Sequence, residues 1–122
     1  MPEYILLLHA DSAAYAGLSP AEIQGVIARY KNWRESLATK GHKAAGQKLQ
    51  DGTGRILKND GKNGGGKIVI TDGPYAETRE VIGGYFVYAA DSFEQAVELA
   101  RDCPHLQYGT VEIRQIEPVP NS

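Results

Sequence analysis

The sequence predicts a single α+β domain in which a four-stranded sheet is backed by two helices. Short apolar runs bounded by glycines predict the strands, and two amphipathic segments with capping residues predict the helices. The 122 residues are enough to bury one core but hardly two. Hydrophobic residues make up 42% of the chain and charged residues 23%, as is typical of a globular protein that folds unaided.

The first part of the chain predicts a strand and a long helix. Residues 4–8 form a continuous apolar run that ends at His9, as expected for a central strand covered on both faces. Ser19 then supplies an N-cap, followed by Pro20 at the first helical position and Glu22 as the capping-box partner. We expect a helix over residues 19–40. Its apolar residues follow at spacings of three and four and predict one core-facing stripe, formed by Ile23, Val26, Ile27, Tyr30, Trp33 and Leu37.

The remaining elements complete a βαββαβ order. Further strands are predicted at residues 43–49, 54–58, 67–71, 85–89 and 110–116. A second helix is predicted to begin at Asp91–Ser92 and to be stopped by Pro104. When the strands at 54–58 and 67–71 are treated as an inserted hairpin, the order matches the ferredoxin-like pattern of a split βαβ pair.

This order places both helices on one face of the sheet, so the other face must be buried by something else. A chain of this length has no third layer with which to cover that face. We therefore expect the protein to form a homodimer through the uncovered face of the sheet.

Charge and cysteine usage limit the class of protein. Residues 29–67 hold ten lysines and arginines against three acids, a local charge of +7, while the rest of the chain carries −9. The only aromatic residues in this stretch have helix-core spacing, so we expect solvated surface or an anion-attracting patch and no nucleic-acid partner. The apolar run at residues 4–8 is far too short for a membrane helix, and no basic region precedes it as in a secretory signal, so we expect neither. With a single cysteine, Cys103, we expect a cytoplasmic protein whose thiol has a packing role.

One glycine-rich segment has the spacing of a phosphate-binding loop without its context. Gly61 to Lys67 matches Gly-x-x-x-x-Gly-Lys, but Ile68 stands where Ser or Thr would hold Mg²⁺, and a strand follows where a helix is required. We predict a hairpin tip. No paired-cysteine, His-x-x-x-His or dinucleotide-binding signature occurs, so neither a metal nor an organic cofactor is expected.

The segment at residues 72–84 is the most unusual in the chain, because an apolar strand runs directly into a Gly-Pro turn and then a polar loop. Glu77 and Glu80 would share a face if the loop takes a helical turn, with Asp72 at the strand end as a third carboxylate. Asp72 could act in catalysis or could only satisfy amides of the turn that follows it.

In a ferredoxin-like sheet the first strand lies between the third and fourth core strands and antiparallel to both. The end of the first strand at His9 should therefore meet the acidic loop and His105, where imidazole and carboxylate could transfer protons or hold a divalent metal. His9 could also be structural, Asp11 could cap the following loop, and His42 is expected on the solvated surface. The candidate catalytic residues are His105, His9, Asp72, Glu77 and Glu80, and the candidate ligand-binding residues are Tyr75, Tyr85 and Asp11.

Residues 72–80 resemble the signature of the YCII-related family, specifically its DGPF branch, with Tyr75 in place of the usual Phe. The resemblance extends from the first apolar run to residues 111–114. It implies a ferredoxin-like fold, a homodimer of the dimeric α/β-barrel type, and a pocket lined by polar residues that include His and Asp. The biochemical role of the family is largely unassigned. DGPF members are often encoded beside extracytoplasmic-function sigma factors, which implies a regulatory connection.

Two functions follow from these observations. The first is a small-molecule enzyme that uses general acid–base catalysis, with His105 or His9 as the proton carrier and a carboxylate that orients it. The second is a non-catalytic module that binds a ligand in the same pocket or a partner on the dimer surface. Such a module could have a regulatory role linked to sigma-factor-dependent transcription. No motif names the substrate.

Overall fold

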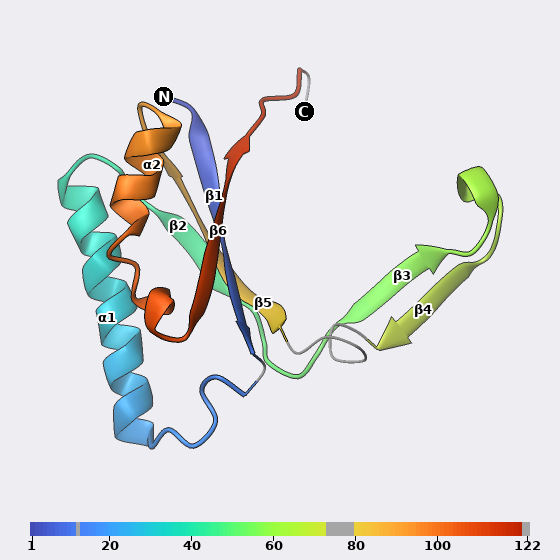
Figure 1. Ribbon diagram of the computed structural model, residues 1–122, viewed down its shortest axis with the longest axis horizontal. Coiled ribbons are helices and arrows are strands. Elements are labelled where there is room, and N and C mark those ends of the chain that lie inside the picture. The colour runs from blue at the N-terminus through green and yellow to red at the C-terminus, as the bar shows by residue number, and fades with distance from the viewer. Residues whose placement is uncertain (12, 73–79, 121–122) are drawn as a thin grey trace.

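The computed structural model describes residues 1–11, 13–72 and 80–120. An antiparallel sheet in the order β2-β5-β1-β6 has both helices on one of its faces (Figure 1). The strands are β1 (Glu3–Asp11), β2 (Ala45–Lys48), β5 (Glu80–Ala89) and β6 (Gly109–Ile116), and the helices are α1 (Pro20–Thr39) and α2 (Phe93–Ala100). This arrangement confirms the predicted ferredoxin-like α+β fold. None of the helices in the described ranges is long and apolar enough to cross a membrane.

Strand β1 occupies the centre of the sheet because its side chains alternate between two apolar faces. Tyr4, Leu6 and Leu8 point toward the helices and are buried, and Leu6 has no exposed surface. Ile5 and Leu7 point to the other face, which none of the helices in the described residues covers, and are only partly buried. The core therefore lies between the sheet and the helices, and the opposite face of the sheet stays open.

Helix α1 starts where the capping residues predict. The Ser19 hydroxyl accepts a hydrogen bond from the Glu22 amide at 3.1 Å, and the Ser19 amide donates to the Glu22 carboxylate at 3.0 Å. Trp33 and Leu37 are buried in the core, as the stripe predicts. The prediction is wrong for Ile23 and Ile27, which remain 41% and 54% exposed because the N-terminal half of the helix overhangs a cavity.

The second half of the chain closes the sheet. Ser92 caps α2, which ends at Ala100, and Pro104 begins a short 3₁₀ helix, η2 (Pro104–Gln107).

Cys103 is buried in the core, and burial raises the pKa of its thiol to about 11, which supports a packing role. The prediction of a solvated His42 is wrong, because that ring is buried and its Nδ1 lies 2.8 Å from the Ala89 carbonyl oxygen.

The predicted inserted hairpin is confirmed as a separate two-stranded sheet. Strands β3 (Arg55–Asn59) and β4 (Ile68–Asp72) pair with each other and project from the body as an arm (Figure 1). Every residue of both strands is exposed. A short 3₁₀ helix, η1 (Lys62–Gly64), forms the tip, so the glycine-rich segment is a hairpin tip as predicted.

Strand β5 begins at Glu80, five residues before the predicted start at Tyr85. The main chain continues as a strand because Glu80 lies opposite Asp11, which extends the pairing to the end of β1. The prediction of a helical turn that carries Glu77 and Glu80 on one face is therefore wrong for Glu80. Glu77 lies outside the described residues.

Candidate functional site

A cavity of about 520 Å³ lies between residues 23–34 of α1 and the helix-facing side of the sheet. Ile23 and Ile27 form the wall contributed by the helix, and Leu8, Val81 and Phe86 form much of the opposite wall. Such a volume, with mostly apolar walls, is in the range of sites that hold small organic molecules.

Three glycines keep this cavity open along the sheet. Gly46 of β2 and Gly83 and Gly84 of β5 all line it, and none of them has a side chain to fill the space. Gly46 also allows β2 to lie close to β5, because a Cβ there would collide with the Tyr85 carbonyl and the Phe86 ring. The floor of the cavity is therefore partly backbone.

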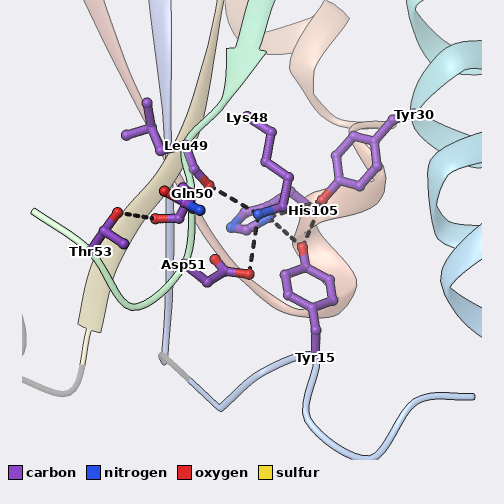
Figure 2. A network of polar contacts seen from close by, with 8 residues as sticks. All are labelled: Tyr15, Tyr30, Lys48, Leu49, Gln50, Asp51, Thr53 and His105. Carbon is purple, nitrogen blue, oxygen red and sulfur yellow. Dashed lines mark hydrogen bonds and ion pairs between the residues drawn. The ribbon is translucent and has the colours of Figure 1, made fainter.

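A polar cluster of three side chains forms one part of the cavity wall (Figure 2). The Nδ1 atom of His105 lies 3.0 Å from the Tyr30 hydroxyl and 3.4 Å from the Tyr15 hydroxyl, and the two hydroxyls are 3.1 Å apart. The Nε2 atom lies 2.8 Å from the carbonyl oxygen of His9. A carbonyl oxygen only accepts, so Nε2 carries the proton and Nδ1 of the neutral ring accepts from a tyrosine.

Burial keeps this cluster uncharged. His105 is 3% exposed, and its desolvation lowers the pKa of the imidazole, an effect that the hydrogen bond to the His9 carbonyl only partly offsets. Burial likewise raises the pKa of Tyr15 and raises that of Tyr30 strongly. At neutral pH the cluster therefore consists of a neutral imidazole and two protonated phenols.

Charged side chains stand elsewhere on the lining of the cavity. Lys48 Nζ is 3.1 Å from an Asp51 carboxylate oxygen and 2.9 Å from the Leu49 carbonyl oxygen (Figure 2). Arg34 donates to the Ala44 carbonyl at 3.0 Å, and its guanidinium carbon lies 5.7 Å from the centre of the Phe86 ring. Lys31 also lines the cavity.

Asp11 lines the cavity, but its carboxylate is engaged locally. One of its oxygens accepts a hydrogen bond from the Ala13 amide at 2.9 Å, so Asp11 caps the turn that follows β1. Asp11 therefore caps the following loop, as one of the two alternatives predicted, and it also lines the cavity.

The side chain of His9 lies on the open face of the sheet and not in the cavity. Its Nε2 is 2.9 Å from a Glu112 carboxylate oxygen, and both residues line a second recess with Glu80. Thr110 also lines this recess and donates to the Glu80 carboxylate at 3.1 Å. The predicted shared cavity is wrong for His9, because its side chain points away from the helices and only its backbone carbonyl reaches His105.

Comparison with known protein families shows that residues 3–120 match the YCII-related domain. The chain belongs to the YCII-related family. Among curated proteins, it is similar to an uncharacterised protein of Rhizobium meliloti (strain 1021), with 30% identity over 57 residues. The aligned part is 45% of this chain and 46% of the relative, so the chain spans about half of the length of that protein.

Two further candidates of this YCII-related domain lie away from the cavity. Asp72 is at the base of the arm, opposite Arg55, and its highly exposed carboxylate is 3.5 Å from the Arg55 guanidinium. Tyr85 lies opposite Leu7 on the open face. The prediction that Asp72 shares a cavity with His105 is wrong, because Asp72 does not line the cavity and its side chain is exposed at the base of the arm. Tyr75 and Glu77 lie outside the described residues.

Sequence reasoning missed both tyrosines of the cavity in this YCII-related chain. Tyr30 was expected in the helix core, and nothing in the irregular segment around Tyr15 marked that residue. The available signal was the spacing of Ile23, Ile27 and Tyr30 along one helix face, which predicts burial but does not say whether side chains or a cavity lie opposite. Among the described residues, no group of His, Cys, Asp and Glu side chains has the arrangement of a metal site.

Proposed function

We propose that the cavity binds a small organic molecule and that His105 acts there as a general base through Tyr30 and Tyr15. The observation that carries this proposal is the arrangement of His105, which is neutral, tied through Nε2 to a backbone carbonyl, and in contact through Nδ1 with two cavity-lining hydroxyls. Among the described residues no carboxylate contacts His105, in contrast to the expectation from the sequence.

The hydrogen-bond directions support a proton relay. Since Nδ1 is an acceptor, Tyr30 donates to it, and Tyr15 can donate to the Tyr30 oxygen 3.1 Å away. A proton released by a bound molecule to the Tyr15 oxygen would displace the Tyr15 proton to Tyr30 and the Tyr30 proton to His105. The molecule then carries the negative charge, His105 carries the positive charge, and both tyrosines are neutral again.

The raised pKa values of the tyrosines assign them a different role from that of the histidine. Because both phenols keep their protons at neutral pH, no phenolate is present to act as the base, and each tyrosine can only pass a proton on while it receives another. The imidazole is the group of the cluster that can gain a proton near neutral pH, especially when a negative charge forms beside it.

An exchange experiment tests this function. Small carbonyl compounds are screened for binding by saturation-transfer NMR, and those that bind are incubated with the protein in deuterium oxide. We expect protons next to the carbonyl group to exchange faster with the wild-type protein, and Tyr15→Phe to reduce this exchange at least about tenfold while binding is kept. Binding without accelerated exchange would favour the non-catalytic module, and absence of binding to the cavity would contradict both.

We also propose that the protein is a homodimer that pairs through the open face of the sheet. Ile5 and Leu7 of β1 lie beside Val87 and Tyr85 of β5 on this face, and together they form an apolar surface that no described helix covers. Burying such a surface is the usual reason for two sheets to pair.

Light scattering at micromolar concentration checks the pairing. The wild-type mass should be twice that of the chain, and Leu7→Lys should give a folded monomer because a buried lysine would be desolvated without a partner. Ile70→Lys on the arm introduces the same charge at an exposed position and should leave the dimer intact. A monomeric wild-type protein would refute the proposal.

A further inference from the structure

We infer that the molecule bound in the cavity is an organic anion with an apolar body, whose acidic group is held by Lys31 and Arg34. This inference rests on the proposed function and adds the chemical class of the ligand. It starts from the lining of the cavity, where apolar and cationic residues are not mixed but occupy successive positions along α1.

The order of residues on the helix sets this arrangement. Ile23 and Ile27 are four residues apart, Lys31 follows after four more and Arg34 after three, so all four occupy one face of α1. All four line the cavity. A ligand that lies along the helix therefore meets apolar side chains near the start of α1 and two cations further along.

Phe86 relates the cationic part of the lining to the polar cluster. The Tyr30 ring stacks on Phe86 with ring centres 6.2 Å apart, and the guanidinium of Arg34 lies 5.7 Å from the centre of the same ring. Tyr30 of the polar cluster and the Arg34 cation thus both border the Phe86 ring. A molecule with an apolar middle, an acidic group and a second polar group would satisfy all three parts of the lining.

The charges on the lining favour an anion over a neutral molecule or a cation. Lys48 is paired with Asp51 at 3.1 Å, so these two charges offset each other. Lys31 and Arg34 have no carboxylate partner among the described residues. Arg34 donates one hydrogen bond to the neutral Ala44 carbonyl. Its other guanidinium donors and its full positive charge remain for an acidic group.

Among the described residues that line the cavity, the remaining carboxylate, Asp11, is distant from these cations. Asp11 is at the end of β1, whereas Arg34 lies over Phe86, which pairs with Leu6. Asp11 is five positions after Leu6 along the strand, or roughly 17 Å away at the rise of an antiparallel strand. At such a separation across water, Asp11 hardly reduces the attraction of an anion to Lys31 and Arg34.

Two fluorescent probes with the same aromatic skeleton test the inference. 8-Anilinonaphthalene-1-sulfonate carries a sulfonate, and N-phenyl-1-naphthylamine lacks it. Fluorescence titration should give a Kd about tenfold lower for the sulfonate with the wild-type protein, because two cations assist its binding. In Lys31→Gln/Arg34→Gln the two Kd values should become equal, with the Kd of the neutral probe changed less than about twofold.

Matched variants make the result specific. Lys40→Gln/Lys43→Gln removes the same charge from exposed positions outside the cavity lining and should keep the preference for the sulfonate. Raising the salt concentration from about 20 mM to about 500 mM should reduce the preference of the wild-type protein for the sulfonate probe, because salt screens the attraction between exposed charges. Circular dichroism melts confirm that each variant is folded.

Ile27→Trp separates failure of the inference from failure of the proposed function. A larger side chain at this half-exposed cavity position should weaken both probes. Suppose that Ile27→Trp weakens the binding of both probes. The anion inference is then overturned, and the binding site stands, if the wild-type protein binds the two probes equally or if Lys31→Gln/Arg34→Gln keeps the preference for the sulfonate. If Ile27→Trp weakens neither probe, the cavity is not a binding site, and the proposed function falls together with the inference.

Discussion

The Nε2 atom of His105 donates to the backbone carbonyl oxygen of His9 across 2.8 Å. This bond joins η2 to the end of the central strand through the main chain of residue 9, independently of its side chain. It also sets the tautomer of His105 and directs Nδ1 to the two tyrosines. The consequences can be tested with substitutions on either side of the bond.

Replacing the two histidines should have unequal effects. His9→Ala keeps the carbonyl and removes only a partly exposed pair with Glu112, so the free energy of unfolding should fall by less than about 1 kcal/mol. His105→Ala empties a buried position and leaves the Tyr30 hydroxyl without its acceptor, and it should cost about 2–4 kcal/mol. Urea denaturation measures both. Equal losses would contradict the separation of the two side chains.

The stability of the protein should decline on mild acidification because of His105. Burial lowers the pKa of this imidazole below its ordinary value of 6.5, which the unfolded chain retains. Below about pH 6.5 the unfolded state binds a proton that the folded state resists, so the free energy of unfolding falls by at most about 1.4 kcal/mol per pH unit until the lowered pKa is reached.

His105→Gln supplies the comparison for this pH dependence. Its amide can still donate to the His9 carbonyl but cannot titrate. Urea denaturation of both proteins between about pH 7.5 and pH 5 should therefore give a steeper decline for the wild-type protein. Parallel curves would show that His105 does not contribute to the decline.

Gly109→Ala should disturb the hydrogen bond between His105 and the His9 carbonyl by moving that carbonyl. A Cβ at Gly109 would overlap the His9 carbonyl oxygen and press on Ala10 of β1. Strand β6 or that carbonyl must then move, and we expect a loss of about 1–3 kcal/mol in the free energy of unfolding. Gly25→Ala in α1 is the control, because its Cβ meets only Arg29 at 3.8 Å and should stabilise the helix by about 0.5–1 kcal/mol. A Gly109→Ala variant as stable as the wild-type protein would contradict the close approach.

The arm should be dispensable for the fold of the body. Arg55 and Asp72 lie opposite each other, so a Gly-Gly link can replace residues 55–72 without stretching the chain. Because every residue of β3 and β4 is exposed and a lone hairpin adds little stability, the free energy of unfolding should change by less than about 1 kcal/mol. Leu6→Ala in the core should instead cost about 2–5 kcal/mol in the same urea assay.

The variant in which Gly-Gly replaces residues 55–72 also tests the role of Asp72. It lacks this residue but keeps the cavity, so it should bind N-phenyl-1-naphthylamine with an unchanged Kd. Loss of cooperative unfolding would show that the arm packs on the body, and loss of probe binding would return Asp72 to the site.

Local signals in the sequence predicted the elements and their order. Ser19 and Glu22 mark the start of α1 because a capping box involves only neighbouring residues. The strand predicted at residues 110–116 is β6, in which Val111 and Ile113 alternate with charged residues. From the order of these elements, the general rule for split βαβ units then predicted the sheet and both helices on one face.

The sequence by itself therefore determined the fold, while the tertiary structure decided the composition of the site. Whether His9 shares a face with His105 depends on how the end of β1 meets η2, a contact between residues far apart in the chain. Pairing with Asp11 extended β5 to Glu80, and only the packing of α1 over the sheet left a cavity beside Tyr15 and Tyr30. Capping and alternation are set by neighbouring residues, whereas the direction of a side chain and the volume beside it are set by partners that the local sequence does not contain.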